Sequence, residues 1–139
     1  MSAFFRRSQA LACAAVLLLS SPAFACDPPS LGAGQKLVDS EHYRVAWRVR
    51  PDPIAVSEPF ALEISVCAKS AAQPAEGIAV DAVMPEHRHG MNYRPSVARI
   101  ESAAGARYRS EGWMFHMPGR WEIVFEVDGE RLADSVSIE

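Results

Sequence analysis

The sequence predicts an all-β protein, an immunoglobulin-like antiparallel β-sandwich of about seven strands. Three observations lead to this prediction. Apolar and polar residues alternate with a period of two along several short segments, which is typical of strands with one buried face. Proline, glycine, serine and aspartate separate these segments at fairly regular intervals, as they do in β-sandwiches. No stretch repeats its apolar residues with a helical period, so the pattern disfavours an α-rich fold.

The expected strands follow from this alternation. The clearest is the segment 43–49, in which every second residue is apolar and charged residues stand between. The segments 60–66, 78–84 and 121–127 repeat the pattern, whereas 97–101 and 108–110 show it over fewer positions. In chain order the seven expected strands are 43–49, 60–66, 78–84, 97–101, 108–110, 121–127 and 132–138.

The N-terminus has the three parts of a secretory signal peptide. Arg6 and Arg7 give a positive start, an apolar run follows over residues 10–19, and an Ala-x-Ala site ends at Ala25. The apolar run is too short to span a bilayer. We therefore expect residues 1–25 to be cleaved and the protein to be periplasmic, secreted across the cytoplasmic membrane.

The remaining chain is long enough for one domain with a modest core. Residues 26–41 form a leader that is rich in turn residues between Pro28 and Gly34. Residues 42–139 carry the expected strands and form the predicted β-sandwich domain.

Cysteine usage suggests an oxidising compartment. Cys13 lies in the signal peptide, which leaves Cys26 and Cys67 as an even pair, and such a pair predicts a disulfide. In the chain-entropy description, closing this loop stabilises the fold by roughly 4 kcal/mol. The alternative is a lipoprotein with Cys26 as its lipidated first residue. That alternative leaves Cys67 unpaired, and Ala23 stands where a lipidation signal normally has a leucine-like residue.

Charge and motifs bear on several function classes. Without the signal peptide the formal charge is about −5, and no basic run could follow a phosphate backbone, so nucleic acid is not expected as a partner. The chain has no Gly-x-Ser-x-Gly, His-Glu-x-x-His or glycine-rich phosphate motif. We expect no enzymatic activity.

Methionine and histidine are crowded into two short stretches. Beyond the signal peptide eight such residues remain, and only His42 lies outside the stretches. Imidazole nitrogen and thioether sulfur together suit a soft or borderline metal, copper above all. The same residue types also fill apolar cores and lie on ordinary surfaces, which is the non-functional alternative. The expected metal ligands are His87, His89, Met91, Met114, His116 and Met117.

The second stretch, residues 113–121, is predicted to be a hairpin. Proline and glycine at positions 118 and 119 suit a type II turn, with Trp121 leading the return strand. Alternation then places Trp113 in the core and His116 on the opposite face, with Met117 at the rim of the turn. We expect no packing role for a methionine there, so His116 and Met117 form the strongest candidate pair.

The first stretch divides into a core residue and a loop. Met84 continues the apolar face of its strand and is predicted to be structural. His87, His89 and Met91 are spaced by two, so an extended segment presents them on one side, although Gly90 can bend the chain.

Among metals, the abundance of methionine favours copper over zinc, which has little use for thioethers. Cu(I) is favoured because the disulfide consumes the thiols, whereas Cu(II) would prefer the histidines with oxygen from Glu86 or Glu111. Imidazole must be neutral to bind a metal, so affinity should fall below the free histidine pKa of about 6.5.

Two motifs carry a family resemblance. They are Met84-Pro85-Glu86-His87-Arg88-His89-Gly90-Met91 and Gly112-Trp113-Met114-Phe115-His116-Met117-Pro118-Gly119-Arg120-Trp121. Together with the signal peptide they resemble the YtkA-like family, which is similar to FixH-like domains, over residues 43–139. The resemblance implies an immunoglobulin-like sandwich in the bacterial envelope, near copper handling, metal efflux and oxidase assembly. The motif positions of the family correspond in this chain to His87, His89, Met91, His116 and Met117.

Two functional hypotheses follow. The first is a periplasmic copper-binding protein, a chaperone or buffer that holds copper through Met and His at the rim of the sandwich. The second is a metal-free interaction domain that docks on a membrane efflux or oxidase assembly protein through the same rim. In that case the exposed Met and His side chains and Tyr93 are contact residues. The sequence does not give the oligomeric state.

Overall fold

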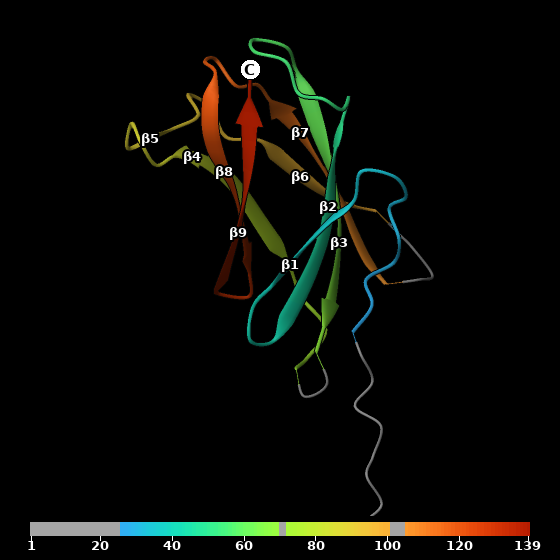
Figure 1. The fold of residues 1–139 in the computed structure, drawn as a ribbon. Helices are drawn as coiled ribbons and strands as arrows, with labels where there is room; N and C mark the ends of the chain where they lie inside the picture. The colour runs from blue at the N-terminus through green and yellow to red at the C-terminus, as the bar shows by residue number, and fades with distance from the viewer. Residues whose placement is uncertain (1–25, 70–71, 101–104) are drawn as a thin grey trace, which may run out of the picture.

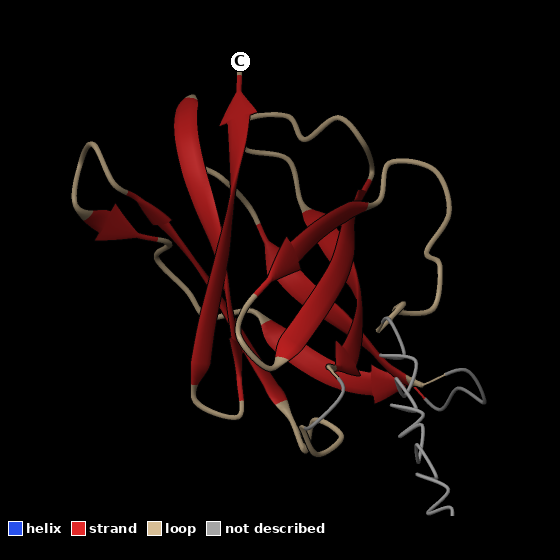
Figure 2. Cartoon of the chain, turned by 60° about the horizontal axis from the view of Figure 1, so that its bottom comes forward, coloured by secondary structure: helices blue, strands red, loops and turns tan. Residues whose placement is uncertain are grey.

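The computed structural model describes residues 26–69, 72–100 and 105–139, so the predicted signal peptide lies outside the described residues. In these residues the chain forms nine strands and no helix (Figure 1, Figure 2). The strands are β1 (Lys36–Asp39), β2 (Tyr43–Arg50), β3 (Phe60–Ala68), β4 (Ile78–Met84), β5 (His89–Gly90), β6 (Ser96–Ile100), β7 (Ala106–Trp113), β8 (Gly119–Val127) and β9 (Glu130–Ile138).

The strands form two antiparallel sheets that pack face to face. One sheet has the order β1-β2-β3-β7-β6 and the other β5-β4-β8-β9. Without the outermost β1 and β5, these are the ABED and CFG orders of an immunoglobulin sandwich. The predicted fold class is confirmed.

All seven expected strands are present, and two short ones are added. β1 lies within the predicted leader and pairs with β2. β5 is only two residues long and pairs with the end of β4, where Met84 lies opposite His89. Segments this short contain too few residues for alternation to reveal a strand. The expected strand at 97–101 is β6, and Glu101 itself lies outside the described residues.

The connection between β7 and β8 is not the predicted hairpin. β7 belongs to the five-stranded sheet and β8 to the four-stranded sheet, so residues 114–118 cross from one sheet to the other. Gly119 does adopt the expected positive φ, at 123°. The positive φ expected at Gly119 is therefore confirmed, but this conformation is local and does not determine which strand β8 pairs with.

The core fills the space between the sheets. The alternation that predicted each strand separates buried from exposed residues, most clearly in β8, where the side chains of four apolar residues at every second position are fully buried. Three tryptophans, Trp47, Trp113 and Trp121, are the largest fully buried side chains. Aromatic rings of this size bury the most apolar area per residue and so dominate the packing.

The leader is tied to the domain. Cys26 and Cys67 form a disulfide, with Cα atoms 5.9 Å apart, as predicted. The Arg44 guanidinium donates to the carbonyl of Cys26 at 3.3 Å, and that of Arg107 donates to the carbonyl of Ser30 at 2.5 Å. Because β2, β3 and β7 contribute these contacts, the leader is fixed to the five-stranded sheet.

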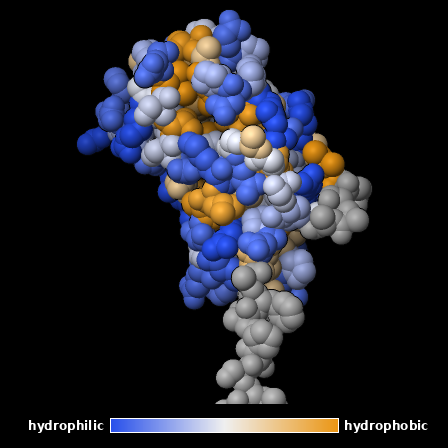
Figure 3. All heavy atoms as spheres, turned by 45° about the vertical axis from the view of Figure 1, so that its right-hand side comes forward, coloured by the Kyte–Doolittle hydropathy of each residue, from blue (hydrophilic) through white to orange (hydrophobic). Residues whose placement is uncertain are grey.

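The surface on the side of the five-stranded sheet is largely hydrophilic, with apolar atoms gathered mainly toward one end (Figure 3). Among the described residues, no helix has the length and apolar character needed to cross a bilayer.

Candidate metal-binding site at one end of the sandwich

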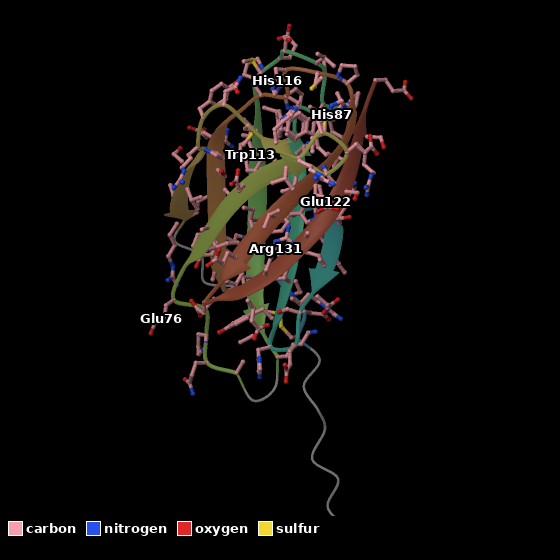
Figure 4. All side chains as sticks on the ribbon, turned by 90° about the vertical axis from the view of Figure 1, so that its left-hand side faces the viewer. Glu76, His87, Trp113, His116, Glu122 and Arg131 are labelled. Atoms are coloured by element: carbon pink, nitrogen blue, oxygen red, sulfur yellow. A yellow bond between two sulfur atoms is a disulfide. The ribbon has the colours of Figure 1, made fainter. Side chains whose placement is uncertain are left out.

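The two stretches of Met and His lie at the same end of the molecule. The first forms the turn 85–88 between β4 and β5, and the second forms the connection 114–118 between β7 and β8. Figure 4 shows His87 and His116 together at this end, with Glu76 at the opposite one. We call the end that carries His87, His89 and His116 the histidine end.

The β4–β5 turn has a tight, defined backbone. The amide of His87 donates to the carbonyl of Met84 at 3.2 Å, and Arg88 adopts a positive φ of 54°. Gly90 allows a close approach, because a Cβ there would lie 3.1 Å from the carbonyl oxygen of Ala82. This backbone leaves His87 exposed and His89 half-buried.

The β7–β8 connection is held on both sides of His116. The buried Phe115 ring stacks on Trp121, with centroids 4.4 Å apart, and its carbonyl accepts a hydrogen bond of 2.8 Å from the amide of Ser57. The Trp121 indole N–H donates to the carbonyl of Met117 at 3.2 Å. His116 is therefore an exposed side chain on a fixed backbone.

The three imidazoles lie side by side. Ring centroids are 5.7 Å apart for His87 and His89, and 5.4 Å apart for His89 and His116. An ion bound to an imidazole nitrogen lies about 3 Å from the ring centre, so two rings on one ion are roughly 5 to 6 Å apart. The structure thus brings together three predicted ligands, from both connections, at a suitable spacing.

Hydrogen bonding indicates which ring nitrogen of His89 is available to a ligand. Its Nδ1 lies 3.2 Å from the carbonyl oxygen of Gly90. A proton on Nδ1 satisfies this bond and leaves Nε2 with an available lone pair, which is the arrangement that orients a metal-binding histidine.

Carboxylates near the two stretches pair with arginines. Glu86 lies 3.5 Å from the Arg120 guanidinium, and Glu111 accepts from Arg109 at 2.7 Å. The hydrogen bond to Glu111 raises the pKa of Arg109. Two carboxylates expected to supply oxygen to Cu(II) are thus engaged elsewhere. Within the described residues, the ion pairs of histidine involve only His42.

The predicted methionine ligands are half-buried. Met91 and Met117 pack against the core, so the expectation that a methionine at this rim has no packing role is wrong for Met117. The turn brings Met117 back over the core instead of leaving it at an open hairpin tip. Met114 is also half-buried. Met84 is fully buried, as predicted, and its Cε lies 2.7 Å from where a Cβ on Gly119 would be.

As the side chains stand, no group of three or more His, Cys, Asp or Glu among the described residues is arranged to hold a metal ion. A complete site therefore needs a change of rotamer, a thioether ligand or both. His87 and His116 are exposed and can rotate, because a surface side chain changes rotamer quickly.

Sequence reasoning missed two contributors to this end. Trp121 was expected only to begin a strand, but both His89 and His116 lie against its ring. The Glu86–Arg120 ion pair, which joins the β4–β5 turn to the start of β8, was also not predicted. The available signal was the pair Arg120-Trp121 directly after Gly119, but Arg120 was assigned to the turn and Trp121 only to the start of a strand.

Searches against family models, curated proteins and solved structures found no match to this chain. The resemblance to the YtkA-like family therefore remains a prediction.

Proposed function

We propose that this protein binds copper at the histidine end and acts as a copper chaperone or buffer in the periplasm. The observation that carries the proposal is the contact of His87, His89 and His116 across two connections that are distant in sequence. Unrelated surface histidines have no reason to meet in this way.

The chemistry of the site supports copper. The imidazoles have no ion-pair partner in the described part of the chain, and the two stretches also carry Met91, Met114 and Met117. Imidazole with thioether suits Cu(I), and imidazole alone also suits Cu(II). Zinc prefers imidazole with carboxylate or thiolate. Here the nearby carboxylates are paired with arginine and the mature cysteines with each other.

The disulfide supports the proposed location. A bond between Cys26 and Cys67 suits an oxidising compartment, and it engages the thiol that lipidation at Cys26 would use. A periplasmic protein that begins at Cys26 therefore fits better than a lipoprotein.

The metal-free alternative, an accessory domain for an efflux or oxidase assembly complex, is favoured by two observations. No described group of three His, Cys, Asp or Glu is ready to hold an ion, while Tyr93 is 41% exposed near the end of the first stretch. An exposed tyrosine suits a protein interface.

A competition titration separates the two functions. The purified protein is titrated with Cu(I) and, separately, with Cu(II), against chromophoric chelators of known affinity. We expect stoichiometric binding, with Cu(I) bound more tightly. The variant with alanine at His87, His89 and His116 should lose it, whereas His42→Ala is the matched control because His42 pairs with Glu130 elsewhere. Unchanged affinity in the triple variant, or no competition in either oxidation state, would contradict the proposal and favour the metal-free domain.

A further inference from the structure

His89 of β5 and His116 of the β7–β8 connection both lie against Trp121. The imidazole of His89 lies 5.8 Å from the indole centroid at an interplanar angle of 68°, and that of His116 lies 5.5 Å away at 79°. The two imidazoles are themselves 5.4 Å apart. The three ring centroids therefore form a nearly equilateral triangle.

This triangle has the dimensions of a small cation site. The point equidistant from the three centroids lies about 3.2 Å from each. An ion bound to an imidazole nitrogen lies about 3 Å from the ring centre, and a cation over an aromatic ring lies within about 6 Å of its centroid. An ion shared by His89 and His116 inside the triangle therefore has the indole as its third neighbour.

The indole can offer such an ion only its π electrons. Its N–H is already used by the carbonyl of Met117, and Phe115 stacks along the ring at an interplanar angle of 12°. The Trp121 side chain is fully buried, so bringing an ion against it removes water from that side of the ion.

We propose that Trp121 is the specificity-determining residue of this site and that its indole contact favours Cu(I) over divalent ions. The inference rests on the proposed copper-binding function. A univalent soft ion is satisfied by few ligands and loses little hydration energy when a π system replaces water. A divalent ion loses much more on desolvation and requires lone-pair donors, which a buried indole does not supply.

The test compares Cu(I) and Zn(II) affinities, by chelator competition, in a graded series at position 121. Trp121→Phe keeps a smaller π system stacked on Phe115, and Trp121→Leu keeps only apolar volume. We expect Cu(I) affinity to fall about ten-fold in the leucine variant and less in the phenylalanine variant. Zn(II) affinity should change by less than about two-fold in both, because zinc gains little from the ring.

Trp113→Phe is the matched control. Trp113 is equally buried, but its indole donates to Ser110, and no contact joins it to a described histidine ring. Its substitution should leave both affinities unchanged. An equal loss of Cu(I) and Zn(II) affinity at position 121, or an unchanged Cu(I) affinity, would overturn the inference.

A second measurement uses the unaltered protein and does not depend on how the variants fold. The chain has three tryptophans, so a proton–nitrogen correlation spectrum shows three indole signals, and Ag(I) serves as a redox-inert probe for Cu(I). We expect Ag(I) to shift the Trp121 signal strongly while Zn(II) leaves it nearly in place. Shifts of imidazole signals with an unchanged Trp121 signal would overturn this inference but leave copper binding intact. No metal response anywhere would overturn both.

Discussion

The two ends of the sandwich both carry histidine, but the imidazoles have different neighbours at the two ends. At the end opposite the histidine end, which we call the anchored end, the His42 ring pairs with the Glu130 carboxylate. At the histidine end His87 lies beside His89 and His89 beside His116, and the rings of His89 and His116 also lie against the Trp121 indole. Exposure alone therefore does not identify a candidate ligand. The useful distinction is whether the protein already supplies a partner for the imidazole.

The anchored end is built for stability. Asp128 accepts hydrogen bonds from the Tyr43 hydroxyl at 2.9 Å and from the amide of Glu76 at 3.1 Å, and so joins the β8–β9 turn to β2 and to the start of β4. The hydrogen bond to Asp128 raises the pKa of Tyr43. The Cys26–Cys67 disulfide lies beside this end, since Cys67 pairs with Arg44 near the start of β2.

The largest expected effect is on stability alone. Replacing Cys26 and Cys67 by serine removes a cross-link that spans 41 residues, and this should lower the free energy of unfolding by roughly 4 kcal/mol. Copper affinity should not change under conditions in which the variant is folded, because the ligands lie at the other end. Chemical denaturation and chelator competition measure the two quantities. A parallel loss of copper affinity would mean that the two ends are not independent.

Gly119→Ala should affect both stability and metal binding. At φ 123° an alanine is strained, and its Cβ would lie 2.7 Å from Met84 Cε, so we expect a loss of about 2 kcal/mol or more. Copper affinity should also fall, because the turn that positions His116 must move. The matched control is Gly129→Ala, with φ 88° and open space around the new Cβ, which should cost about 1 kcal/mol and leave copper binding unchanged. Equal effects of the two substitutions on both quantities would exclude a special role for the Met84 contact.

Stability, which depends on the anchored end, and copper affinity, which depends on the histidine end, should be lost in different pH ranges. Hydrogen bonds from Ser40 and His42 lower the pKa of Glu130, and those from Lys69 and Arg44 lower the pKa of Asp39. A carboxyl with a lowered pKa stabilises the fold above its unfolded value, here 4.5 for glutamate and 3.8 for aspartate. This stabilisation is lost as the pH falls through the folded pKa.

Copper affinity should decline at higher pH than stability does, because protons compete for imidazole near pH 6.5. Near pH 5 the protein should therefore be folded with weakened copper binding. Denaturation and competition curves at several pH values test this, and simultaneous loss of fold and affinity would contradict it.

The smallest expected effect concerns the ion pair between the β4–β5 turn and the start of β8. Glu86 and Arg120 are both largely exposed, so Glu86→Gln should cost less than about 1 kcal/mol of stability. If the pair only restrains the β4–β5 turn, copper affinity should fall by no more than about three-fold, and less at high salt. Arg131→Gln is the control, because Arg131 contacts Glu122 instead. A loss of ten-fold or more would indicate that Glu86 binds the metal directly.

Much of the fold could be predicted from the sequence, because burial on one face of a strand leaves a direct trace in the residue order. The seven alternating segments and the buried Met84 were predicted in this way, whereas the Cys26–Cys67 disulfide was predicted from the even number of cysteines beyond the signal peptide. β5 could not be predicted, because a pair of residues such as His89 and Gly90 has no periodicity.

The site was harder to predict because its contacts are between segments distant in sequence. That His89 meets His116 depends on which sheet β8 joins, and the Pro118-Gly119 turn suits a hairpin and a crossing between sheets equally well. The role of Trp121 depends on the same choice. The six proposed ligands were predicted from residue chemistry, spacing and the family resemblance, and the structure places three of them, the histidines, side by side around His89.

The most direct test of the central claim is the imidazole proton–nitrogen correlation spectrum of the purified protein. It is recorded before and after addition of one equivalent of Cu(I), under an oxygen-free atmosphere. The chain has four histidines, so the spectrum monitors both ends at once, and single alanine variants assign the signals. The account predicts that signals of His89 and His116, with His87, shift on binding while His42 stays in place beside Glu130. A shift confined to His42, or no shift at any histidine, would contradict it.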